Sequence, residues 1–599
     1  MNIIEFSQFL KQIEENNSRN YKIEVLSKLL LNLKESELPA SIYMLDGRIG
    51  PRYLPLVYNY SIKLMIRTLD KLAGETISQK LYHSLGDIGL AASKIREELM
   101  VNKKDLNINE VYDALTEIAL KKGKGSQEAK INKMAELFLS LDVLSIKYVS
   151  RIIVGNLRLG LNYRTVLDAI SFAIKGDKSL RGILDRAYGI RSDLGTITSI
   201  AMFSDIKSLK RIKLQVGVPL ASKLVEREKS AEAIYKRLGE HIIQPKYDGL
   251  RAQIHLDKKG FKKILSISKQ NKNDQKILDI ADEDMVAIYS RNMDNITEMF
   301  PDIVRKVTTL NVESLVLDSE VIGYNPKTEK FVPFQETIQR KRKYDVGGKV
   351  TSIPVKVKIF DLLCFNGNDL TLEPLQVRLE KLQKIIPSHD CMLEVSESIK
   401  VSSIDEMKKY FNKYIKVGLE GLISKKKDSI YKPGTRDFDW IKLKASASSE
   451  FVDTIDAVIL GYYLGRGARA KFGIGALLVG VYDKEKDEFV SVAKIGTGIK
   501  DEEWREYKKA LDQIEVKDKP DSVVVDRVLY PDVWVRPEIV SVIDADQITR
   551  SKHHTAGRSN KTGYGYSLRF PRMKQFKRDK QATDATTVKE LIEMYELAR

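Results

Sequence analysis

The sequence predicts a multidomain protein in which an all-α N-terminal domain is followed by an α+β domain and an all-β C-terminal domain. The first observation is length, because 599 residues exceed what one hydrophobic core usually holds. The second is periodicity, since apolar residues recur every three or four positions up to about residue 215. The third is a change to short apolar or alternating runs after that point. We therefore predict domains at 1–215, 216–444 and 445–599.

The N-terminal domain is predicted to be helical throughout. Ile23–Leu30 and Val111–Leu120 carry apolar residues at helical spacing. Tyr148–Gly160 ends a predicted helix in a turn that contains glycine and arginine. Such a turn can offer amide and guanidinium groups to a phosphate. The spacing alone favours the simpler interpretation, which is a helix end with solvated arginines.

The middle domain mixes short strands with helices, which is typical of an α+β fold with antiparallel sheets. Helices are predicted at Leu375–Ile386 and Ile404–Ile415. The polar stretch from 257 to 285 predicts an exposed insertion. The predicted strands are Ala252–Leu256, Val286–Tyr289, Ser314–Leu317, Val355–Phe360 and Gly421–Ser424.

The C-terminal domain has short strands separated by glycines and one internal helix, predicted at Asp501–Leu511. This pattern suits a small closed barrel such as an oligonucleotide-binding (OB) fold. A terminal helix is predicted at Gln581–Arg599. The predicted strands are Asp456–Tyr463, Gly475–Val481, Phe489–Val492 and Trp534–Ile543.

The composition favours a polyanionic partner. The formal charge is +18, from 100 basic and 82 acidic residues, which suggests nucleic acid first and an anionic membrane surface second. No run of about 18 apolar residues is present, so we expect no transmembrane helix. Cys364 and Cys391 are the two cysteines, too few for a disulfide framework or a four-cysteine zinc site. The N-terminus lacks a secretory signal, and we expect a cytoplasmic protein.

The segment Lys246–Arg251 contains the strongest chemical signal. An apolar run precedes it and an alternating run follows it, so we expect Lys246 to lie in or beside the floor of a sheet. A lysine held there can act as a nucleophile toward phosphorus. The alternative is a solvated turn in which Lys246 and Asp248 have no catalytic role.

Further candidate residues lie at the ends or on one face of predicted strands. One is aromatic, Phe360, and the others are charged: Arg291, Asp318 with Glu320, Glu420, and Lys442 with Lys444. Each has a simpler explanation, as a surface ion pair, a core aromatic residue or a solvated strand face. Together they suit phosphoryl transfer, which needs cations, carboxylates for a divalent metal and a wall for a base. The chain lacks the glycine-rich loop of Walker-type ATPases, so a lysine nucleophile is the favoured route.

This set resembles the covalent nucleotidyltransferases, and within them the ATP-dependent DNA ligases of the archaeal and eukaryotic replicative type. Two further segments, Gly86–Gly89 and Asn156–Gly160, are similar to signatures of the family's helical DNA-binding domain. The resemblance covers about residues 45 to 580. The motifs occur in the family's order as Gln244–Arg251, Ser290–Asn292, Asp318–Glu320, Phe360–Asp361, Glu420–Lys425, Lys442–Lys444, Ser567–Arg572 and Arg578–Lys580.

The resemblance implies a DNA-binding domain, an adenylation domain and an OB domain, and a reaction with ATP and Mg²⁺ or Mn²⁺. It implies that Lys246 attacks the α-phosphorus of ATP, that the resulting AMP passes to the 5′-phosphate of a nick, and that the 3′-hydroxyl then releases AMP. The implied nucleotide-binding residues are Gln244, Arg251, Arg291, Glu320, Phe360, Arg436, Lys442 and Lys444. The implied metal ligands are Glu320 and Glu420, and the implied closing residues of the OB domain are Arg569, Asp579 and Lys580.

Three features depart from the family's pattern. The polar insertion near Lys269–Asp284 lengthens the path from Lys246 to Arg291. Val540–Ile543 stands where many relatives carry a glutamate, so no role for that carboxylate is carried over. Gln244 replaces the glutamate of many eukaryotic members, and an amide both donates and accepts, so the nucleotide choice could be looser than ATP alone.

Other interpretations fit less well. A capping guanylyltransferase or an RNA ligase would not need the helical domain, and an NAD-dependent ligase would bring a four-cysteine zinc module. A catalytically dead nucleic-acid scaffold would not need Lys246, Glu320, Glu420 and Lys442 intact. The expected partner is nicked double-stranded DNA, bound by a monomer in replication, repair or recombination. A sliding clamp is a further possible partner, although Ser78–Tyr82 begins a clamp-binding peptide without completing one.

Overall fold

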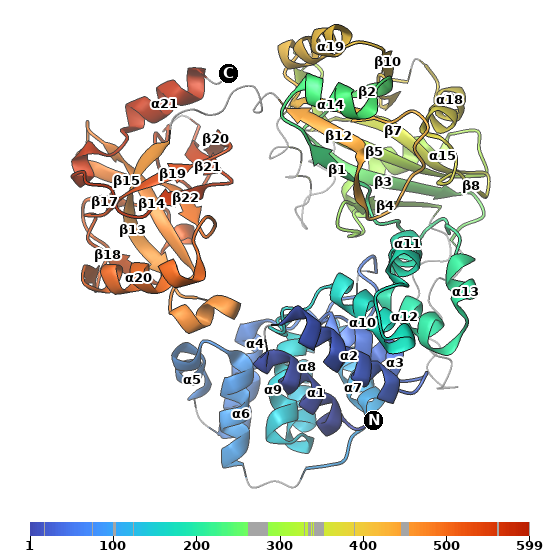
Figure 1. Cartoon of the computed structure of the whole chain (residues 1–599). Coiled ribbons are helices and arrows are strands. Elements are labelled where there is room, and N and C mark those ends of the chain that lie inside the picture. Colours follow the sequence, from blue (N-terminus) through green and yellow to red (C-terminus); the bar gives the residue numbers. More distant parts are fainter. Residues whose placement is uncertain are drawn as a thin grey trace. The chain divides into compact units, whose positions relative to one another are not determined.

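The computed structural model describes residues 1–599 except 17, 55, 75, 100–102, 124, 262–284, 329, 333–336, 338–339, 341–352, 389, 445–453, 466, 560–561 and 598–599. The chain divides into two compact units, Met1–Ala445 and Ser446–Arg599 (Figure 1). The predicted domain boundary at residue 215 falls inside the first unit and stays a prediction. The predicted insertion at Lys269–Asp284 lies outside the described residues.

The first part of unit one is helical, as predicted, and its helices begin where the sequence supplies caps. The side chain of Asn2 accepts a hydrogen bond from the amide of Glu5. Asn107 caps the helix that begins at Ile108 in the same way. Buried aliphatic residues of these helices form one continuous core. The helices are α1 Ile3–Glu15, α2 Arg19–Asn32, α3 Leu38–Leu45, α4 Ile62–Ala73, α5 Ser78–Leu85, α6 Ile88–Glu98, α7 Ile108–Leu120, α8 Ser126–Ser140, α9 Val143–Ile153, α10 Tyr163–Lys175, α11 Arg181–Arg191, α12 Leu194–Phe203 and α13 Ile206–Lys210.

The turn after α9 corrects one sequence-based expectation, because its arginines are not solvated. Arg151 is buried and pairs with Asp87 at 2.9 Å, and Arg158 pairs with the same carboxylate at 2.8 Å. Arg158 also donates to the carbonyl of Gly86 at 2.8 Å. A Cβ at Gly89 would lie 2.6 Å from the carbonyl oxygen of Lys147, so only glycine allows this approach. The two signature segments of the helical domain are therefore joined by buried ion pairs.

The rest of unit one contains two mainly antiparallel sheets, with strand orders β1-β12-β11-β2-β10 and β4-β3-β5-β7-β8. Strand β5 is longer than predicted, so Asp318 and Glu320 lie in its middle. The core of the second sheet is aliphatic. The strands are β1 Leu224–Arg227, β2 His241–Lys246, β3 Leu250–Asp257, β4 Val286–Ser290, β5 Ser314–Asn325, β6 Lys330–Phe331, β7 Val355–Phe365, β8 Asn368–Asp369, β9 Leu393–Val395, β10 Ile399–Val401, β11 Gly421–Lys425 and β12 Arg436–Lys444, and the helices are α14 Ala231–Leu238, α15 Pro301–Thr308, α18 Leu375–Ile385 and α19 Ile404–Lys416.

Unit two is a β domain with helices α20 Asp501–Asp512 and α21 Val588–Leu597 (Figure 1). The order of a helical, an α+β and a β part confirms the predicted fold class. No helix in the described residues is long and apolar enough to cross a membrane. The strands are β13 Ile455–Tyr463, β14 Ala476–Asp483, β15 Glu488–Ile495, β16 Glu515–Val516, β17 Val523–Val524, β18 Val533–Val535, β19 Val540–Asp544, β20 Gln547–Ser551, β21 Gly565–Arg569 and β22 Arg572–Gln575.

Two elements of unit two differ from the sequence-based prediction. The single strand expected at Trp534–Ile543 is two strands, β18 and β19, because Pro537 between them has no N–H for a ladder hydrogen bond. The terminal helix begins at Val588 rather than at Gln581. Thr587 and Glu590 exchange a capping pair of hydrogen bonds, which sets the start of α21.

Candidate active site

The first sheet brings four predicted site residues to one face. Gly421 in β11 pairs with Lys246 in β2 on one side and with Lys444 in β12 on the other. Ile423, two residues further, pairs with Gln244 and Lys442 in the same way. Residues opposite one another across adjacent strands share a face, and so do residues two apart along a strand. Lys246, Lys444, Gln244 and Lys442 therefore point to the same side.

Glu420 lies at the end of this face and holds the candidate nucleophile. Its Oε2 atom is 2.5 Å from Nζ of Lys246 and 3.1 Å from Nζ of Lys444. Among the described residues no well-aligned hydrogen bond reaches Oε2, so these contacts are ion pairs. Burial by itself would raise the pKa of Glu420, but Lys246 and then Lys444 outweigh it and lower the pKa to about 2. Glu420 is therefore a stable anion between two cations.

A glycine separates the two lysines for a steric reason. Gly421 has a φ of +142°, and a Cβ on it would lie 2.1 Å from the carbonyl oxygen of Leu443. No L side chain fits there without moving the backbone of β12. Glycine at this position therefore permits the close pairing of β11 with β12 that sets Lys246 and Lys444 on either side of it.

The second sheet contributes Glu320, which lies opposite Arg251 in the pairing of β3 with β5. Burial raises the pKa of Glu320 to about 7, although the charges of Lys246 and Arg251 oppose that rise. A Cβ at Gly249 would lie 2.6 Å from the carbonyl oxygen of Val321, so glycine permits the close approach of Lys246–Arg251 to β5. Cγ of Glu320 would lie 2.9 Å from that same Cβ, so Glu320 packs against the turn that follows Lys246.

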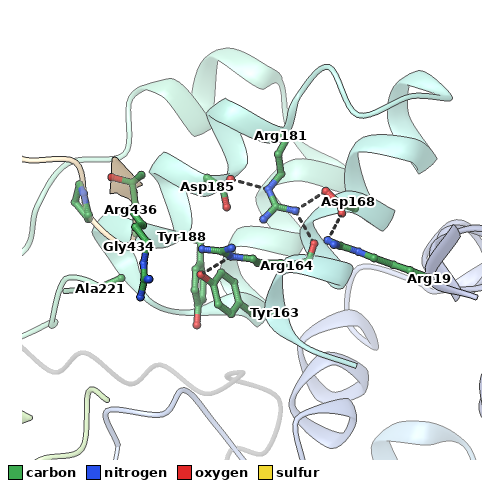
Figure 2. Close-up of a pocket in the computed structure, with 13 residues that line it drawn as sticks. Arg19, Tyr163, Arg164, Asp168, Arg181, Asp185, Tyr188, Ala221, Gly434 and Arg436 are labelled. Carbon is green, nitrogen blue, oxygen red and sulfur yellow. Dashed lines mark hydrogen bonds and ion pairs between the residues drawn. The ribbon is translucent and has the colours of Figure 1, made fainter. Parts of the chain in front are cut away.

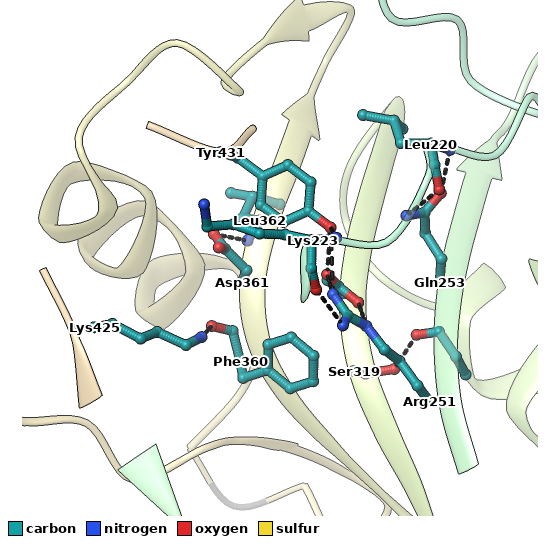
Figure 3. Close-up of polar contacts among 12 residues, drawn as sticks. Leu220, Lys223, Arg251, Gln253, Ser319, Phe360, Asp361, Leu362, Lys425 and Tyr431 are labelled. Carbon is teal, nitrogen blue, oxygen red and sulfur yellow. Dashed lines mark hydrogen bonds and ion pairs between the residues drawn. The ribbon is translucent and has the colours of Figure 1, made fainter. Parts of the chain in front are cut away.

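Arg251 is held tightly by the protein itself, as Figure 3 shows. Its Nε and Nη2 atoms donate to both oxygens of Asp318 at 3.0 and 2.6 Å, and Nη1 donates to the carbonyl of Lys223 at 2.7 Å. The hydroxyl of Tyr431 also donates to Asp318, at 2.8 Å. Asp318 is fully buried and is the partner of Arg251. Most donors of Arg251 are thus already engaged.

Phe360 comes forward from the second sheet at an irregularity in the pairing of β5 with β7. The register shifts between Asp318 and Ser319, which pair with Asp361 and Ile359, so Phe360 is the extra residue. Such bulges re-aim side chains. The ring of Phe360 is partly exposed and lies edge-on to Trp440 at 6.3 Å between ring centres. It is not a fully buried core residue.

Gln244 is fixed next to Phe360. Its Nε2 atom donates to the carbonyl of Phe360 at 3.2 Å and to Oγ of Ser398 at 2.9 Å. With the donors engaged by the protein, the amide oxygen is the atom that remains to accept a hydrogen bond. This orientation was not predictable from the sequence, where the amide could equally donate.

Lys425 is a site residue that the sequence analysis did not single out (Figure 3). It is buried, its Nζ lies 3.7 Å from the ring centre of Trp440 and 4.7 Å from that of Phe360, and it donates to the carbonyl of Phe360 at 3.3 Å. Burial lowers the pKa of Lys425 to about 7. Its place at the end of the Glu420–Lys425 motif was the available signal. Nothing in the sequence pointed to Tyr431 or Lys223.

Arg291 and Arg436 extend the positive face. Desolvation lowers the pKa of Arg291, and the nearby charges of Arg251 and Arg436 lower it further. Desolvation likewise lowers the pKa of Lys442, with contributions from Lys444, Lys246 and Arg436. A concentration of cations that depress one another's pKa values favours an anionic ligand with several charges.

The closing residues predicted in unit two lie on β21 and on the segment after β22. Arg569 donates weakly to Gln547 at 3.5 Å, and Asp579 is exposed. Lys580 and its neighbour Arg578 pair with the buried Asp456 at 2.9 and 2.6 Å. Their predicted contact with the nucleotide stays a prediction.

A divalent metal suits the donors present, although the described residues contain no preformed group of three or more acidic, histidine or cysteine ligands. Glu320 in β5 of the second sheet and Glu420, which precedes β11 of the first, offer carboxylate oxygens. Mg²⁺ typically takes one or two carboxylates and completes its shell with substrate phosphates and water. The two carboxylates therefore fit such an ion only together with a bound nucleotide.

Known proteins and family models of one kind match this chain over nearly its whole length. Residues 2–171 match the model of the DNA ligase N terminus, 272–444 that of the ATP dependent DNA ligase domain, and 470–580 that of the ATP dependent DNA ligase C terminal region. A probable DNA ligase of Dictyoglomus turgidum is 42% identical over 595 residues, which cover 99% of this chain and 97% of the relative. A DNA ligase of Staphylothermus marinus is 36% identical over 616 residues, covering 99% and 98%.

Among solved structures, Pmar-Lig_PreS3 matches with a TM-score of 0.53 over 95% of this chain and 99% of that one, at 16% sequence identity. That likeness concerns the fold alone. The full-length relatives and the three consecutive family matches go further, and they show that this chain belongs to the family of ATP-dependent DNA ligases.

Proposed function

We propose that this protein seals nicks in duplex DNA with ATP, through an adenylate carried by Lys246. The observation that carries the proposal is the shared sheet face on which Lys246 lies 2.5 Å from Glu420 and beside Lys442 and Lys444. A nucleophile, an acid and phosphate-binding cations are the groups that covalent adenylyl transfer requires. A nucleic-acid scaffold would need none of them in this arrangement.

In the proposed first step, the uncharged amine of Lys246 attacks the α-phosphorus of ATP. The new N–P bond forms as the bond from that phosphorus to the pyrophosphate oxygen breaks, and the nitrogen loses a proton to solvent or to a neighbouring base. Lys442 and Lys444 would offset the charge that accumulates on the departing pyrophosphate. Arg436 is assigned the same task from the far end of β12.

The proposed adenine site lies between Phe360 and Gln244. The partly exposed ring of Phe360 offers a stacking face, which is worth about 1–3 kcal/mol for a base on an aromatic side chain. The free acceptor of Gln244 suits the 6-amino group of adenine and not the 6-carbonyl oxygen of guanine. This orientation favours ATP over GTP, although the glutamine alone left that choice open.

Glu320 and Glu420 are the proposed ligands of Mg²⁺, with Glu320 also placed to accept from the ribose. When bound, the ion would neutralise phosphate charge and orient the triphosphate. Mn²⁺, with similar preferences for oxygen ligands, is the proposed substitute.

The later proposed steps use nicked DNA. AMP passes from Lys246 to the 5′-phosphate, and the 3′-hydroxyl then attacks that phosphorus and releases AMP. We assign Arg291 to the phosphate, while Arg251 mainly lines the site because Asp318 engages it. Arg569, Asp579 and Lys580 are proposed to close over the nucleotide during the first step and to withdraw for DNA. Sliding-clamp binding by Ser78–Tyr82 has little support, because this segment starts helix α5.

The test is covalent labelling with ATP radiolabelled at the α-phosphate. We expect the full-length protein to acquire a Mg²⁺-dependent label that is labile in acid and stable in base, as a phosphoramidate is. Lys246→Ala should abolish both the label and nick sealing. α-labelled GTP should label the protein far less than ATP.

Lys400→Ala is the matched control, since Lys400 lies in strand β10 of the same sheet and is largely exposed. It should label as the wild type does. Sealing by Lys246→Ala in a preparation free of other ligases would refute the assignment of the nucleophile.

A further inference from the structure

A cavity of about 420 Å³ lies within unit one, and Lys246 is not among the residues that line it (Figure 2). One wall is formed by the first residues of α10 and by one side of α11, and Arg19 at the start of α2 adjoins it. The other wall is the segment 433–436, which leads into β12. The cavity therefore joins the helical part of the unit to its α+β part.

The charges that line this cavity are unbalanced. Asp168 accepts from Arg19 at 2.7 Å and also pairs with Arg181, and Arg181 donates to Asp185 at 2.6 Å. These two carboxylates are thus already engaged. Four guanidinium groups face them, and they belong to Arg19, Arg164, Arg181 and Arg436.

Two of the four arginines that line the cavity have no carboxylate partner among the described residues. No ion pair of Arg164 or Arg436 is recorded among the residues that the structure describes. Nε of Arg164 donates to the hydroxyl of Tyr163 at 3.1 Å, which leaves the two terminal nitrogens of its guanidinium group for another acceptor. The two arginines come from different parts of the unit, Arg164 from α10 and Arg436 from β12. The excess of two positive charges inside a cavity favours an anion that both can reach.

The walls of the cavity are held by close packing. Tyr163 stacks on Tyr188 with ring centres 4.8 Å apart. The amide of Ala221 donates to the carbonyl of Gly189 at 2.8 Å, and a Cβ on Gly189 would lie 2.7 Å from the carbonyl oxygen of Pro433. Because this contact excludes any larger residue at 189, the two walls keep a defined separation.

We propose that this cavity binds a phosphate group of a DNA strand, gripped by Arg164 from one side and Arg436 from the other. Guanidinium groups match phosphate oxygens in geometry and remain charged at all relevant pH values. The proposal rests on the proposed function, because it takes the polyanion to be the DNA substrate. A phosphate bound there would tie the helical part to the α+β part.

The triphosphate of ATP is the other source of such a group. Of the residues assigned to the nucleotide, only Arg436 lines the cavity, while Lys246, Phe360 and Lys442 do not. An ATP molecule that presents its α-phosphorus to Lys246 would therefore reach this cavity through Arg436 alone, while Arg164 lies on the opposite wall. This separation favours the DNA strand.

The experiment measures binding of the full-length protein to a nicked duplex, without ATP, by fluorescence anisotropy between about 50 and 200 mM salt. Arg164→Ala should weaken binding about tenfold at the lower salt concentration, as expected for one charge-assisted contact. It should also reduce the slope of log affinity against log salt by about one. Arg164→Lys should restore the slope and only part of the affinity. Lysine keeps the positive charge but loses the planar guanidinium group that binds phosphate through two N–H donors.

Arg186→Ala is the matched control, because Arg186 lies on α11, does not line the cavity and donates to the carbonyl of Lys210. It should bind as the wild type does. Arg164→Ala combined with Arg436→Ala should weaken binding by less than the product of the two single effects if both residues hold one phosphate.

An unchanged salt slope in Arg164→Ala would overturn the proposal. So would a variant that binds DNA normally but needs more ATP for self-labelling, because the occupant would then be the nucleotide. DNA binding is measured without any reaction at Lys246. A failed labelling experiment would therefore refute the proposed function, whereas the binding data for Arg164→Ala would still decide whether the cavity holds a DNA phosphate.

Discussion

At the scale of single residues, burial shifts two site groups toward the same pKa from opposite directions. Burial raises the pKa of Glu320 to about 7 and lowers that of Lys425 to about 7. Both shifts disfavour the charged form, as expected where water is excluded. The site therefore contains an acid and a base that change charge near neutral pH.

These shifts predict a pH dependence of stability that substitution should remove. Between pH 7 and 10.5 the amine of Lys425 is neutral in the folded protein and protonated in the unfolded chain. The unfolded state binds more protons there, so this group makes stability rise with pH. We expect Lys425→Met to flatten that rise, measured as the melting temperature of the full-length protein across this range.

Lys426→Met is the control, because Lys426 is the exposed neighbour in sequence and pairs only at 3.9 Å with Asp428. It should keep the slope of the wild type. Equal slopes for all three proteins would mean that Lys425 stays protonated in the folded state.

The residues that the sequence analysis proposed were those whose side-chain type by itself suggests a chemical role. Lys246, Glu420 and Lys442 were proposed because potential nucleophiles, acids and cations occur there within short motifs. Lys425 and Tyr431 were not, since their importance comes from burial and from partners more than 60 residues away in the chain. The role of Arg251 was predicted without its partner, because the pairing of β3 with β5 decides which carboxylate it meets.

At the scale of elements, the register between neighbouring strands decides which side chains lie together in the candidate site. The alternation of residues in β2, β11 and β12 places the lysines and Gln244 on one face. The bulge in β7 turns Phe360 out of the sheet core. Strand positions were predictable from sequence patterns, but register and bulges depend on contacts between segments far apart and were not.

The buried link between the signature segments of the helical domain is open to a direct test. Asp87 caps α6 by accepting from the amide of Leu90 at 3.0 Å, and it pairs with Arg151 and Arg158. Asp87→Asn keeps the cap, since asparagine caps equally well, but removes the negative charge that Arg151 and Arg158 share. Arg151 then keeps only Glu14 at 3.1 Å as an anionic partner, and Arg158 keeps only the carbonyl of Gly86. We expect a loss of about 1.5–3 kcal/mol in unfolding free energy, measured with denaturant, because hydrogen bonds to a charged group are lost while other partners remain.

Asp142→Asn is the matched variant for comparison. Asp142 caps α9 by accepting from Ser145 at 3.1 Å and is not in an ion pair recorded among the described residues. Its substitution should change stability little, because the cap survives. Similar losses in both variants would show that the cap, and not the ion pairs, matters at Asp87.

At the scale of the whole molecule, the excess of positive charge predicts the salt dependence of DNA binding. The chain carries a formal charge of +18, and neutralising DNA phosphates releases counterions. With six to ten phosphate contacts, affinity should fall by about 10³ to 10⁵ between about 50 and 200 mM salt. Anisotropy measurements on a nicked duplex would check this, and a flat response would argue against DNA binding through the excess of positive charge.

The predicted order of helical, α+β and β parts is confirmed, because helical and strand periodicities differ strongly enough to be seen in sequence alone. The two predicted elements of unit two that differ, Trp534–Ile543 and Gln581–Arg599, depended on one proline and one capping pair. Local signals of that kind shift element boundaries without altering the order of domains.

The ion pairs of Glu420 have a consequence for the timing of the reaction. A single carboxylate oxygen contacts both Lys246 and Lys444, so a competing cation that draws this oxygen away would release both amines together. Unmasking the attacking group and supplying a counter-charge for the triphosphate would then be one event instead of two. In the absence of such a competitor, Lys246 stays in contact with Glu420.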